Sequence, residues 1–392
     1  MFSKSKISLM IIALVVTGLT DTSCNQAKNN NQEKNEGFVI KRGTNLSHWL
    51  SQDFGWAPKY TWIKESDIRF IDSLGFDHVR IPVDEKEMWN ESGNPIPEAF
   101  EQLNSCLDWC QKYGLRAIVD LHVIRSHHFN ASNDGETNTL WTDTTAQNNF
   151  VEIWRKLSEV LHNRPENMVA FEILNEAVAP ENDDWNKLMN KAVAAIRELE
   201  PNRVLVIGAN MWQIAPNLQY LILPEGDKNL ILSFHTYSPL AFTHYKADWT
   251  QLKYYKGGAH YPGQVISDED YGKYIDTTNQ ELVDQTADAR EIWNKEKLID
   301  VFKSGLEFAR SKNLPLYCGE FGCLPTVDRK ERLAYYSDMI DALEENSIAW
   351  CNWEYKGDFG LYFFDAEKKI SLQPDEELIH ILLKGSKKQN NQ

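Results

Sequence analysis

Short apolar runs alternate with amphipathic stretches along the chain from residue 39 onward. Eight of these runs are nearly continuous in hydrophobic residues, as expected for parallel strands that are buried on both faces. The predicted strands are Val39–Leu46, His78–Val83, Arg116–His122, Met168–Glu176, Val204–Asn210, Leu230–Tyr237, Pro315–Phe321 and Ile348–Tyr355. Their spacing, with helix-like segments between them, predicts a series of β/α units.

The segments between the strands carry apolar residues at helical spacing. Gly75 and Gly114 directly follow the predicted helices Thr61–Leu74 and Glu98–Tyr113, where a helix commonly ends in a left-handed residue. Further helices are predicted at Asn149–His162, Asp184–Leu199, Lys295–Lys312 and Arg329–Glu344. Strands and helices in this alternation favour an α/β fold, a closed (β/α)₈ TIM barrel forming a single catalytic domain. An open doubly wound sheet is the alternative, but it predicts a glycine-rich first turn, and no GxGxxG follows the first strand.

One long stretch, Ser238–Asp284, interrupts the alternation after the sixth strand and is predicted to be irregular. It is rich in Tyr, Trp, Gly and His. Long loops in compact domains are usually functional or disordered, and the aromatic content favours a functional role here.

The N-terminus has the features of an export signal. Lys4 and Lys6 precede the apolar stretch Ile7–Leu19, which has signal-peptide length and is short for a transmembrane helix. Cys24 then follows small and polar residues, as in bacterial lipoprotein signals, although Asp21 stands where a leucine is usual. We expect lipidation of Cys24 in preference to plain secretion.

These features predict four segments. Residues 1–23 form a lipoprotein-type signal peptide, residues 24–36 a flexible polar tether, residues 37–385 the catalytic domain, and residues 386–392 a polar tail. The protein is then exported and anchored by lipid to the bacterial outer membrane, on its periplasmic or cell-surface side. We expect a monomer.

Charge and composition narrow the class of ligand. A formal net charge of −16 opposes binding to nucleic acid and to anionic membranes, while neutral sugars are indifferent to it. The 13 Trp, 15 Tyr and 17 Phe provide flat rings of the kind that stack on sugars. Cys106 and Cys110 are expected on the side of a helix that faces the core. The sequence contains no Cys/His cluster with zinc spacing, so we predict no metal and no cofactor.

Polar side chains gather at the ends of the predicted strands, which meet at one rim of a barrel. They are Arg80, His122, Asn175, Glu176, His235, Tyr237 and Glu320, together with Trp353. Glu176 and Glu320 end the fourth and seventh strands, which face each other across the barrel. Such a pair suits cleavage of a glycosidic bond, in which one carboxyl group protonates the leaving oxygen and the other attacks the anomeric carbon.

Seven short motifs occur in order along the chain: Arg42-Gly43-Thr44-Asn45-Leu46, Val79-Arg80-Ile81-Pro82, Val119-Asp120-Leu121-His122, Leu174-Asn175-Glu176, Phe234-His235-Thr236-Tyr237, Gly319-Glu320-Phe321-Gly322 and Trp353. With these motifs the sequence resembles glycoside hydrolase family 5, the cellulase-type family of retaining (β/α)₈ hydrolases, from Gly43 to about Tyr362. The chain departs from that pattern at Ala177, where the family usually has proline.

The resemblance implies a role for each residue of the rim. Glu176 is expected to be the general acid/base and Glu320 the nucleophile, with Arg80 holding Glu320 ionised. Asn175 is expected to donate to a sugar 2-hydroxyl, and Tyr237 to hydrogen-bond the nucleophile.

The remaining expectations concern sugar binding. His235 is expected beside the acid/base, His122 on a hydroxyl of the −1 sugar, and Trp353 under that sugar, with a satisfied buried imidazole as the alternative for each histidine. Trp212 and Trp249 are the preferred candidates for outer subsites. The sequence is equally compatible with a core or a cleft position for four further tryptophans, Trp49, Trp56, Trp89 and Trp141. His127 and His128 are either additional subsite residues or solvated loop residues.

The favoured function is a retaining endo-β-1,4-glucanase that acts on β-glucan or a related polysaccharide. A β-mannanase, xyloglucanase or β-glucosidase of the same family is the alternative. A barrel that binds glycan without cleaving it is a remote possibility, because both carboxylates are present.

Overall fold

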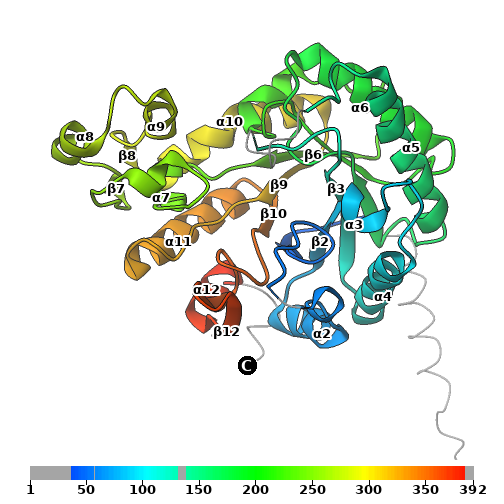
Figure 1. Ribbon diagram of the computed structural model, residues 1–392, viewed down its shortest axis with the longest axis horizontal. Coiled ribbons are helices and arrows are strands. Elements are labelled where there is room, and N and C mark those ends of the chain that lie inside the picture. Colours follow the sequence, from blue (N-terminus) through cyan, green and yellow to red (C-terminus); the bar gives the residue numbers. More distant parts are fainter. Residues whose placement is uncertain (1–36, 57, 131–137, 385–392) are drawn as a thin grey trace, which may run out of the picture. The chain divides into compact units, whose positions relative to one another are not determined.

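The computed structural model describes residues 37–56, 58–130 and 138–384. Eight parallel strands form a closed barrel in the order β1-β10-β9-β6-β5-β4-β3-β2 (Figure 1). The strands are β1 (Arg42–Asn45), β2 (His78–Asp84), β3 (Arg116–Val123), β4 (Val169–Glu172), β5 (Leu205–Gly208), β6 (Leu230–His235), β9 (Leu316–Glu320) and β10 (Ala349–Asn352). The predicted TIM barrel is therefore confirmed.

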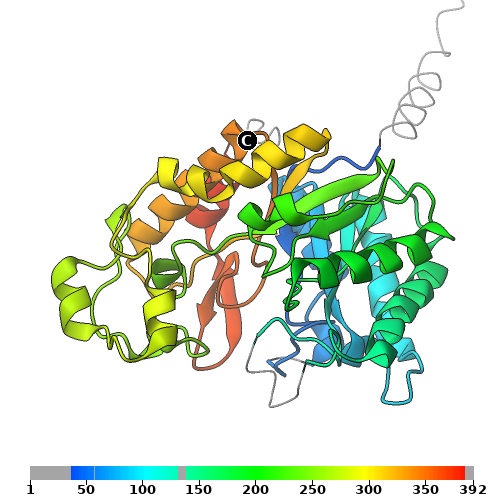
Figure 2. The same cartoon turned by 90° about the horizontal axis from the view of Figure 1, so that it is seen from above.

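Helices cover the outside of the barrel, as seen from two directions in Figures 1 and 2. They are α2 (Glu65–Leu74), α3 (Glu85–Met88), α4 (Pro97–Tyr113), α5 (Thr144–Leu161), α6 (Asn182–Arg197), α10 (Lys295–Lys312), α11 (Arg329–Glu345) and α12 (Glu376–Leu382). Gly75 and Gly114 end α2 and α4 at φ 104° and 77°, as predicted. On the inward face of α4, Cys106 and Cys110 are buried and unpaired, which confirms their placement in the core.

The fifth β/α unit, for which no helix was predicted, contains no α-helix between β5 and β6. After β5 the chain forms only a short 3₁₀ helix, η2 (Ala215–Tyr220), with Pro216 in its first turn. Three consecutive residues ahead of it, Met211, Trp212 and Gln213, have φ between 53° and 64°. Left-handed residues cannot belong to a right-handed helix, so the strand-end segment is instead a tight turn at the rim.

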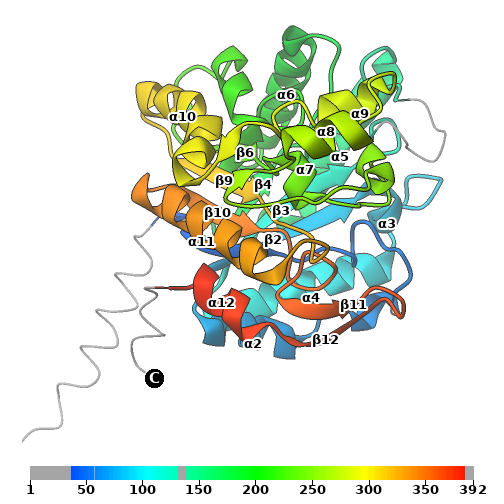
Figure 3. The ribbon, with the colours of Figure 1, turned by 90° about the vertical axis from the view of Figure 1, so that its left-hand side faces the viewer.

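The stretch predicted as irregular after β6, Ser238–Asp284, is partly ordered into short elements, and these continue past its predicted end. These are α7 (Leu240–Thr243), η3 (Gln251–Tyr254), β7 (Gly263–Gln264), α8 (Asp268–Tyr274), α9 (Gln280–Gln285) and β8 (Ile292–Trp293). They lie together on one side of the barrel, at the left of Figure 1 and toward the viewer in Figure 3. Elements this short carry too few turns for an apolar period to be visible, which explains why the sequence reading was wrong.

A layer of apolar side chains fills the barrel interior below the rim at which the strands end. Its members are Ile118, Ala170, Val206, Ile231, Tyr317 and Cys351, packed with Ile40. Alternate residues of a strand face the same side, so the residues two positions further along share the interior. There the side chains become polar, with Asp120 on β3, Glu172 on β4 and Ser233 on β6, all fully buried.

Several predictions fall on residues outside the described ranges: the signal peptide 1–23, the tether 24–36 with Cys24, and the tail 386–392. These, the domain limits 37–385, the lipid anchor and the monomeric state stay predictions.

Among the helices of the described ranges, none is long and apolar enough to cross a bilayer. A two-stranded sheet of β11 (Tyr362–Asp365) and β12 (Ile370–Pro374) follows the barrel.

Candidate active site

The guanidinium of Arg80 lies at the centre of the barrel mouth and is completely buried. Its Nη1 donates to Glu320 Oε1 at 2.6 Å and to Asn45 Oδ1 at 3.0 Å. Its Nη2 donates to Asn175 Oδ1 at 2.9 Å. The predicted contact between Arg80 and Glu320 is therefore present, and the same cation orients the amide beside Glu176.

Two further carboxylates bind Arg80, and sequence reasoning gave neither of them a role. Glu172 accepts from Nε at 2.6 Å, and Asp120 Oδ2 lies 3.0 Å from Nη2. The two residues are paired in register on β3 and β4. Burial raises the pKa of each to about 7, against the opposing charge of Arg80. A charge inside an otherwise apolar strand must have a partner, and that rule was the available signal for both residues.

Glu176 and Glu320 face each other across the mouth, with His235 between them. One carboxylate oxygen of each glutamate and a ring nitrogen of His235 all lie within 4.8 Å of one another. His235 Nδ1 is 2.8 Å from Glu176 Oε1 and 3.8 Å from Glu320 Oε2. Tyr237 donates to Glu320 Oε2 at 2.9 Å. This separation is shorter than the roughly 6.5–9.5 Å that admits both a sugar ring and an attacking water between two carboxyl groups.

The surroundings give the two glutamates different affinities for a proton. Burial raises the pKa of Glu176 well above its ordinary value, and the charge of Glu320 raises it further. Burial also raises the pKa of Glu320, but the charge of Arg80 and the hydrogen bond from Tyr237 oppose that rise. Glu176 therefore holds its proton more tightly than Glu320, the division of labour that an acid and a nucleophile require.

His122 and Trp353 form one wall of the mouth. Their rings are stacked, with centroids 5.6 Å apart and planes 11° apart. His122 Nδ1 is 2.7 Å from Asp120 Oδ2, and burial lowers the pKa of His122 to about 4. The imidazole is thus neutral, with its proton on Nδ1. Its Nε2 has no protein partner among the described residues and remains available as an acceptor for a hydroxyl group.

The comparisons with known proteins agree with this geometry. The model of the family "Cellulase (glycosyl hydrolase family 5)" matches residues 31–358. The chain belongs to this family. It is a glycoside hydrolase with the expected fold, and the resemblance first drawn from seven motifs is confirmed.

Individual relatives span nearly the whole chain. Endoglucanase C of Acetivibrio thermocellus is 36% identical over 356 residues, covering 88% of this chain and 98% of its own. Cellodextrinase A of Ruminococcus flavefaciens is 27% identical over 323 residues, covering 81% of this chain and 85% of its own. Thermotoga maritima Cel5A, solved with mannotriose, superposes with a TM-score of 0.67 at 22% identity, covering 90% of this chain and 99% of its own. That last likeness concerns the fold alone.

In this member of the cellulase family, two exposed tryptophans are joined to residues of the barrel mouth through other aromatic residues. Trp212 is 42% exposed, and its Nε1 donates at 2.8 Å to the carbonyl of Phe129, whose ring packs against His122. Trp249 is 51% exposed and contacts Phe359. Both rings are open to solvent, and their assignment to outer subsites stays a prediction.

The other tryptophan and histidine candidates are buried or partly buried. Trp49 and Trp89 are buried in the core, and Trp56 and Trp141 pack against it while only partly buried. His127 is fully buried and accepts from the Val178 amide at 3.1 Å, so neither the subsite nor the solvated reading describes it. A supporting role for a loop histidine could not be read from the sequence, because its partner is 51 residues away.

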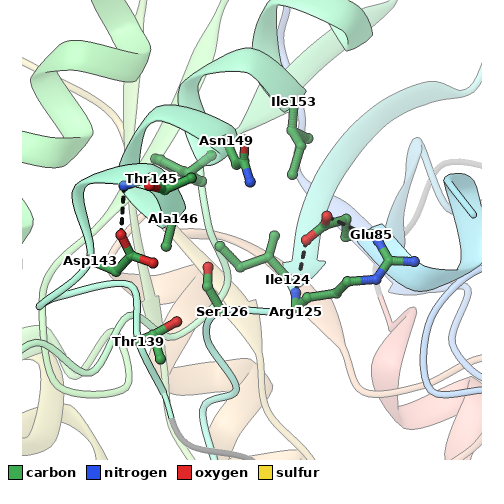
Figure 4. Close-up of a pocket in the computed structure, with 11 residues that line it drawn as sticks. Glu85, Ile124, Arg125, Ser126, Thr139, Asp143, Thr145, Ala146, Asn149 and Ile153 are labelled. Carbon is green, nitrogen blue, oxygen red and sulfur yellow. Dashed lines mark hydrogen bonds and ion pairs between the residues drawn. The ribbon is translucent and has the colours of Figure 1, made fainter. Parts of the chain in front are cut away.

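A cavity of about 240 Å³ lies beside the end of β3 (Figure 4). Arg125 and Glu85 border it as an ion pair with an Nη1–Oε1 distance of 3.0 Å, and Asp143 caps α5 through the Thr145 amide. None of the strand-end residues predicted to be catalytic lines this cavity. The residues predicted to be catalytic therefore lie at the mouth and not around this cavity.

Glu176, His235 and Glu320 also present donor types that bind divalent cations. In this arrangement Glu176 and His235 bind each other, while Glu320 binds Arg80 and Tyr237. A guanidinium 2.6 Å from Glu320 repels a second cation. The arrangement thus suits acid–base and nucleophilic chemistry, and the expectation of no metal stays a prediction.

Proposed function

We propose that this chain is an endo-acting β-1,4-glucanase that hydrolyses β-glucan with net retention at the anomeric carbon. The observation that carries the proposal is the close approach of Glu176 and Glu320, in which one carboxylate oxygen of each lies within 4.8 Å of one oxygen of the other. Retaining enzymes place their carboxyl groups roughly 5–5.5 Å apart, whereas inverting enzymes need about 6.5–9.5 Å to admit a water. The substrate class follows from the endoglucanases among the relatives, which align over 88% of this chain.

Two displacements make up the reaction. In the first, Glu320 attacks the anomeric carbon while protonated Glu176 delivers its proton to the leaving oxygen, so that a glycosyl ester forms and the glycosidic bond breaks. Arg80 and Tyr237 hold Glu320 by one oxygen each, which aims it and keeps it ionised. In the second, Glu176 removes a proton from water, which attacks the same carbon and releases Glu320.

Three residues support the proposed binding of a sugar at the point of cleavage. The Nδ2 of Asn175 is buried and has no protein partner among the described residues, while its Oδ1 is fixed by Arg80. That donor is available for the 2-hydroxyl, where a hydrogen bond strengthens in the transition state. His122 Nε2 is the matching acceptor, and the ring of Trp353 behind it provides an apolar face.

Product analysis tests the proposal. We expect rapid loss of viscosity of barley β-glucan and carboxymethylcellulose, slower action on xyloglucan and mannan, and the β-anomer as the first product in proton NMR. The α-anomer appearing first would contradict retention. Mannan as the preferred polymer, or release of single glucose units without loss of viscosity, would contradict the substrate or the endo mode and leave the hydrolytic site intact.

The pH profile of kcat/KM is expected to be bell-shaped, with Glu320 on the acid limb and Glu176 on the alkaline limb. Activity falls at low pH as Glu320 gains a proton, and at high pH as Glu176 loses its own. Because the pKa of Glu176 is raised well above its ordinary value, the alkaline limb lies well above the usual carboxyl range of about 4.3.

The Tyr237→Phe variant isolates the acid limb. The hydroxyl of Tyr237 lowers the pKa of Glu320. Loss of this hydroxyl should therefore move the acid limb to higher pH. An acid limb that stays in place would show that the hydrogen bond from Tyr237 does not stabilise the ionised nucleophile.

A further inference from the structure

Gln213 occupies an unusual position beneath the acid/base glutamate. Its side chain is completely buried, although the neighbouring Trp212 is 42% exposed. Both residues and Met211 adopt left-handed backbone angles, with φ of 53°, 58° and 64° for Gln213, Trp212 and Met211. Three such residues in succession persist only where surrounding contacts hold them, and such strain is concentrated at functional sites.

The amide of Gln213 joins the two halves of the catalytic site. Its Oε1 accepts from the backbone amide of Glu176 at 2.8 Å. Its Nε2 donates to Glu172 Oε1 and to Ser233 Oγ, both at 3.2 Å. Glu172 in turn binds Arg80. One chain of hydrogen bonds therefore runs from the backbone of the acid to the cation that holds the nucleophile.

The backbone of Gln213 contributes a second contact to the same pair. Its carbonyl accepts from the amide of His235 at 3.0 Å, and the imidazole of His235 contacts Glu176 at 2.8 Å. The residue thus fixes both the main chain of the acid and the main chain of the acid's side-chain partner. Glu176 itself has φ 45°, a conformation that needs support.

The barrel leaves space for this side chain at the end of β5. A Cβ added to Gly208 would lie 2.2 Å from the Cγ of Gln213. Only glycine lets the amide reach this place, since any larger residue would displace it. This requirement ties a strand residue to the position of Gln213.

The loop that follows the acid is held by two side chains and by one backbone hydrogen bond. Val178 donates its amide to His127 Nε2 at 3.1 Å, and Ala179 donates to Asn210 Oδ1 at 2.7 Å. The carbonyl of Ala177 accepts from Met211 at 2.8 Å. Gln213 is the member of this set that contacts Glu176 directly.

We propose that Gln213 is a positioning residue for the general acid, which holds the backbone of Glu176 in its left-handed conformation and links it to the Arg80 network. The inference rests on the proposed retaining mechanism. A carboxamide is suited to the task because it offers an acceptor to the Glu176 amide and a donor to the Glu172 carboxylate at once. Neither an apolar side chain nor a carboxylate does both.

Leaving-group dependence separates positioning of the acid from general support of the fold. An aryl β-cellobioside with a 2,4-dinitrophenyl group departs without protonation, whereas a phenyl group needs the acid. For Gln213→Leu we expect kcat/KM to fall about 10²-fold on the phenyl substrate, the lower end of what general acid catalysis contributes, and to change only about threefold on the dinitrophenyl substrate.

Two further variants keep the test independent of how well Gln213→Leu folds. Gly208→Ala displaces the amide without altering it, and should give the same preference for the activated substrate. Gln213→Glu keeps the acceptor but sets a second carboxyl group against Glu172. At acidic pH, kcat/KM of this variant should approach that of the parent. As the pH rises, the introduced carboxyl group ionises, so the variant should lose activity at a lower pH than the parent does.

Asn186→Leu is the matched control. Asn186 is another buried carboxamide, 3% exposed, whose side chain binds the backbone of Tyr220 and Ile222 outside the site. Its loss should lower the melting temperature and leave the ratio of rates on the two substrates unchanged. Equal losses on both substrates for Gln213→Leu and Gly208→Ala would overturn the positioning role. A parent enzyme that cleaves neither substrate would instead refute the proposed function, and the inference with it.

Discussion

Replacing Glu320 with glutamine is expected to lower kcat/KM on β-glucan on the order of 10⁵-fold, as is typical for the loss of a covalent nucleophile. The substitution preserves the shape of a side chain that is almost completely buried. It removes the charge that attacks the anomeric carbon. The fold should persist, because the amide can still accept from Arg80 or Tyr237 through its oxygen.

A small anion should report which carboxyl group was lost. In Glu320→Gly, azide can enter the vacated space and attack from the nucleophile's face, giving an α-glycosyl azide from an activated aryl β-cellobioside. In Glu176→Gly, azide attacks the glycosyl ester from the other face and gives the β-product. Glu345→Gln, on a side chain that is 55% exposed, is the control and should match the parent. Parent-like hydrolysis by Glu320→Gln would refute its assignment as nucleophile.

Replacing Arg80 with methionine is expected to have the second largest effect, on stability as well as activity. Three buried carboxylates, Asp120, Glu172 and Glu320, would lose their shared cation. Removing one partner of a buried ion pair costs about 3–5 kcal/mol, because the remaining charge stays desolvated. Since Arg80 lowers the pKa of Glu320, its loss should also move the acid limb of the pH profile upward.

Urea unfolding monitored by fluorescence, together with kcat/KM against pH, measures both effects. Arg80→Lys serves as the matched variant, since it keeps the charge but lacks the planar fork that reaches Glu172, Asn175 and Glu320 in different directions. It should recover part of the stability and little of the activity. Unchanged unfolding of Arg80→Met would contradict the view that this guanidinium holds the barrel mouth together.

The family and its rim residues could be predicted because they depend on local patterns. Buried parallel strands are continuous in apolar residues, so a polar residue at the end of such a run is conspicuous, as with Glu320 and His122. Asp120 and Glu172 were equally visible inside apolar strands but received no role. Their partner, Arg80, lies 40 and 92 residues away, and sequence spacing gave no means of pairing them.

The turn after β5 is a feature that could not be predicted from the sequence. Met211, Trp212 and Gln213 are not residue types that announce a left-handed backbone, and that conformation exists because of contacts with the loop after Glu176. Similarly, the short elements between α7 and β8 fall below the length at which a hydrophobic period can be recognised. Both were therefore missed for the same reason: their stability comes from tertiary contacts.

The sequence alone determined the barrel, the family and the two carboxylates. Buried strands are recognisable as apolar runs along the chain, and their ends as the polar residues that follow these runs. Tertiary structure decided how those carboxylates differ. Burial, the charge of Arg80 and the hydroxyl of Tyr237 divide the proton between Glu176 and Glu320, and Gln213 joins the backbone of one to the network of the other. These effects act through space over a few ångströms between segments far apart in the chain, so only the folded barrel contains them.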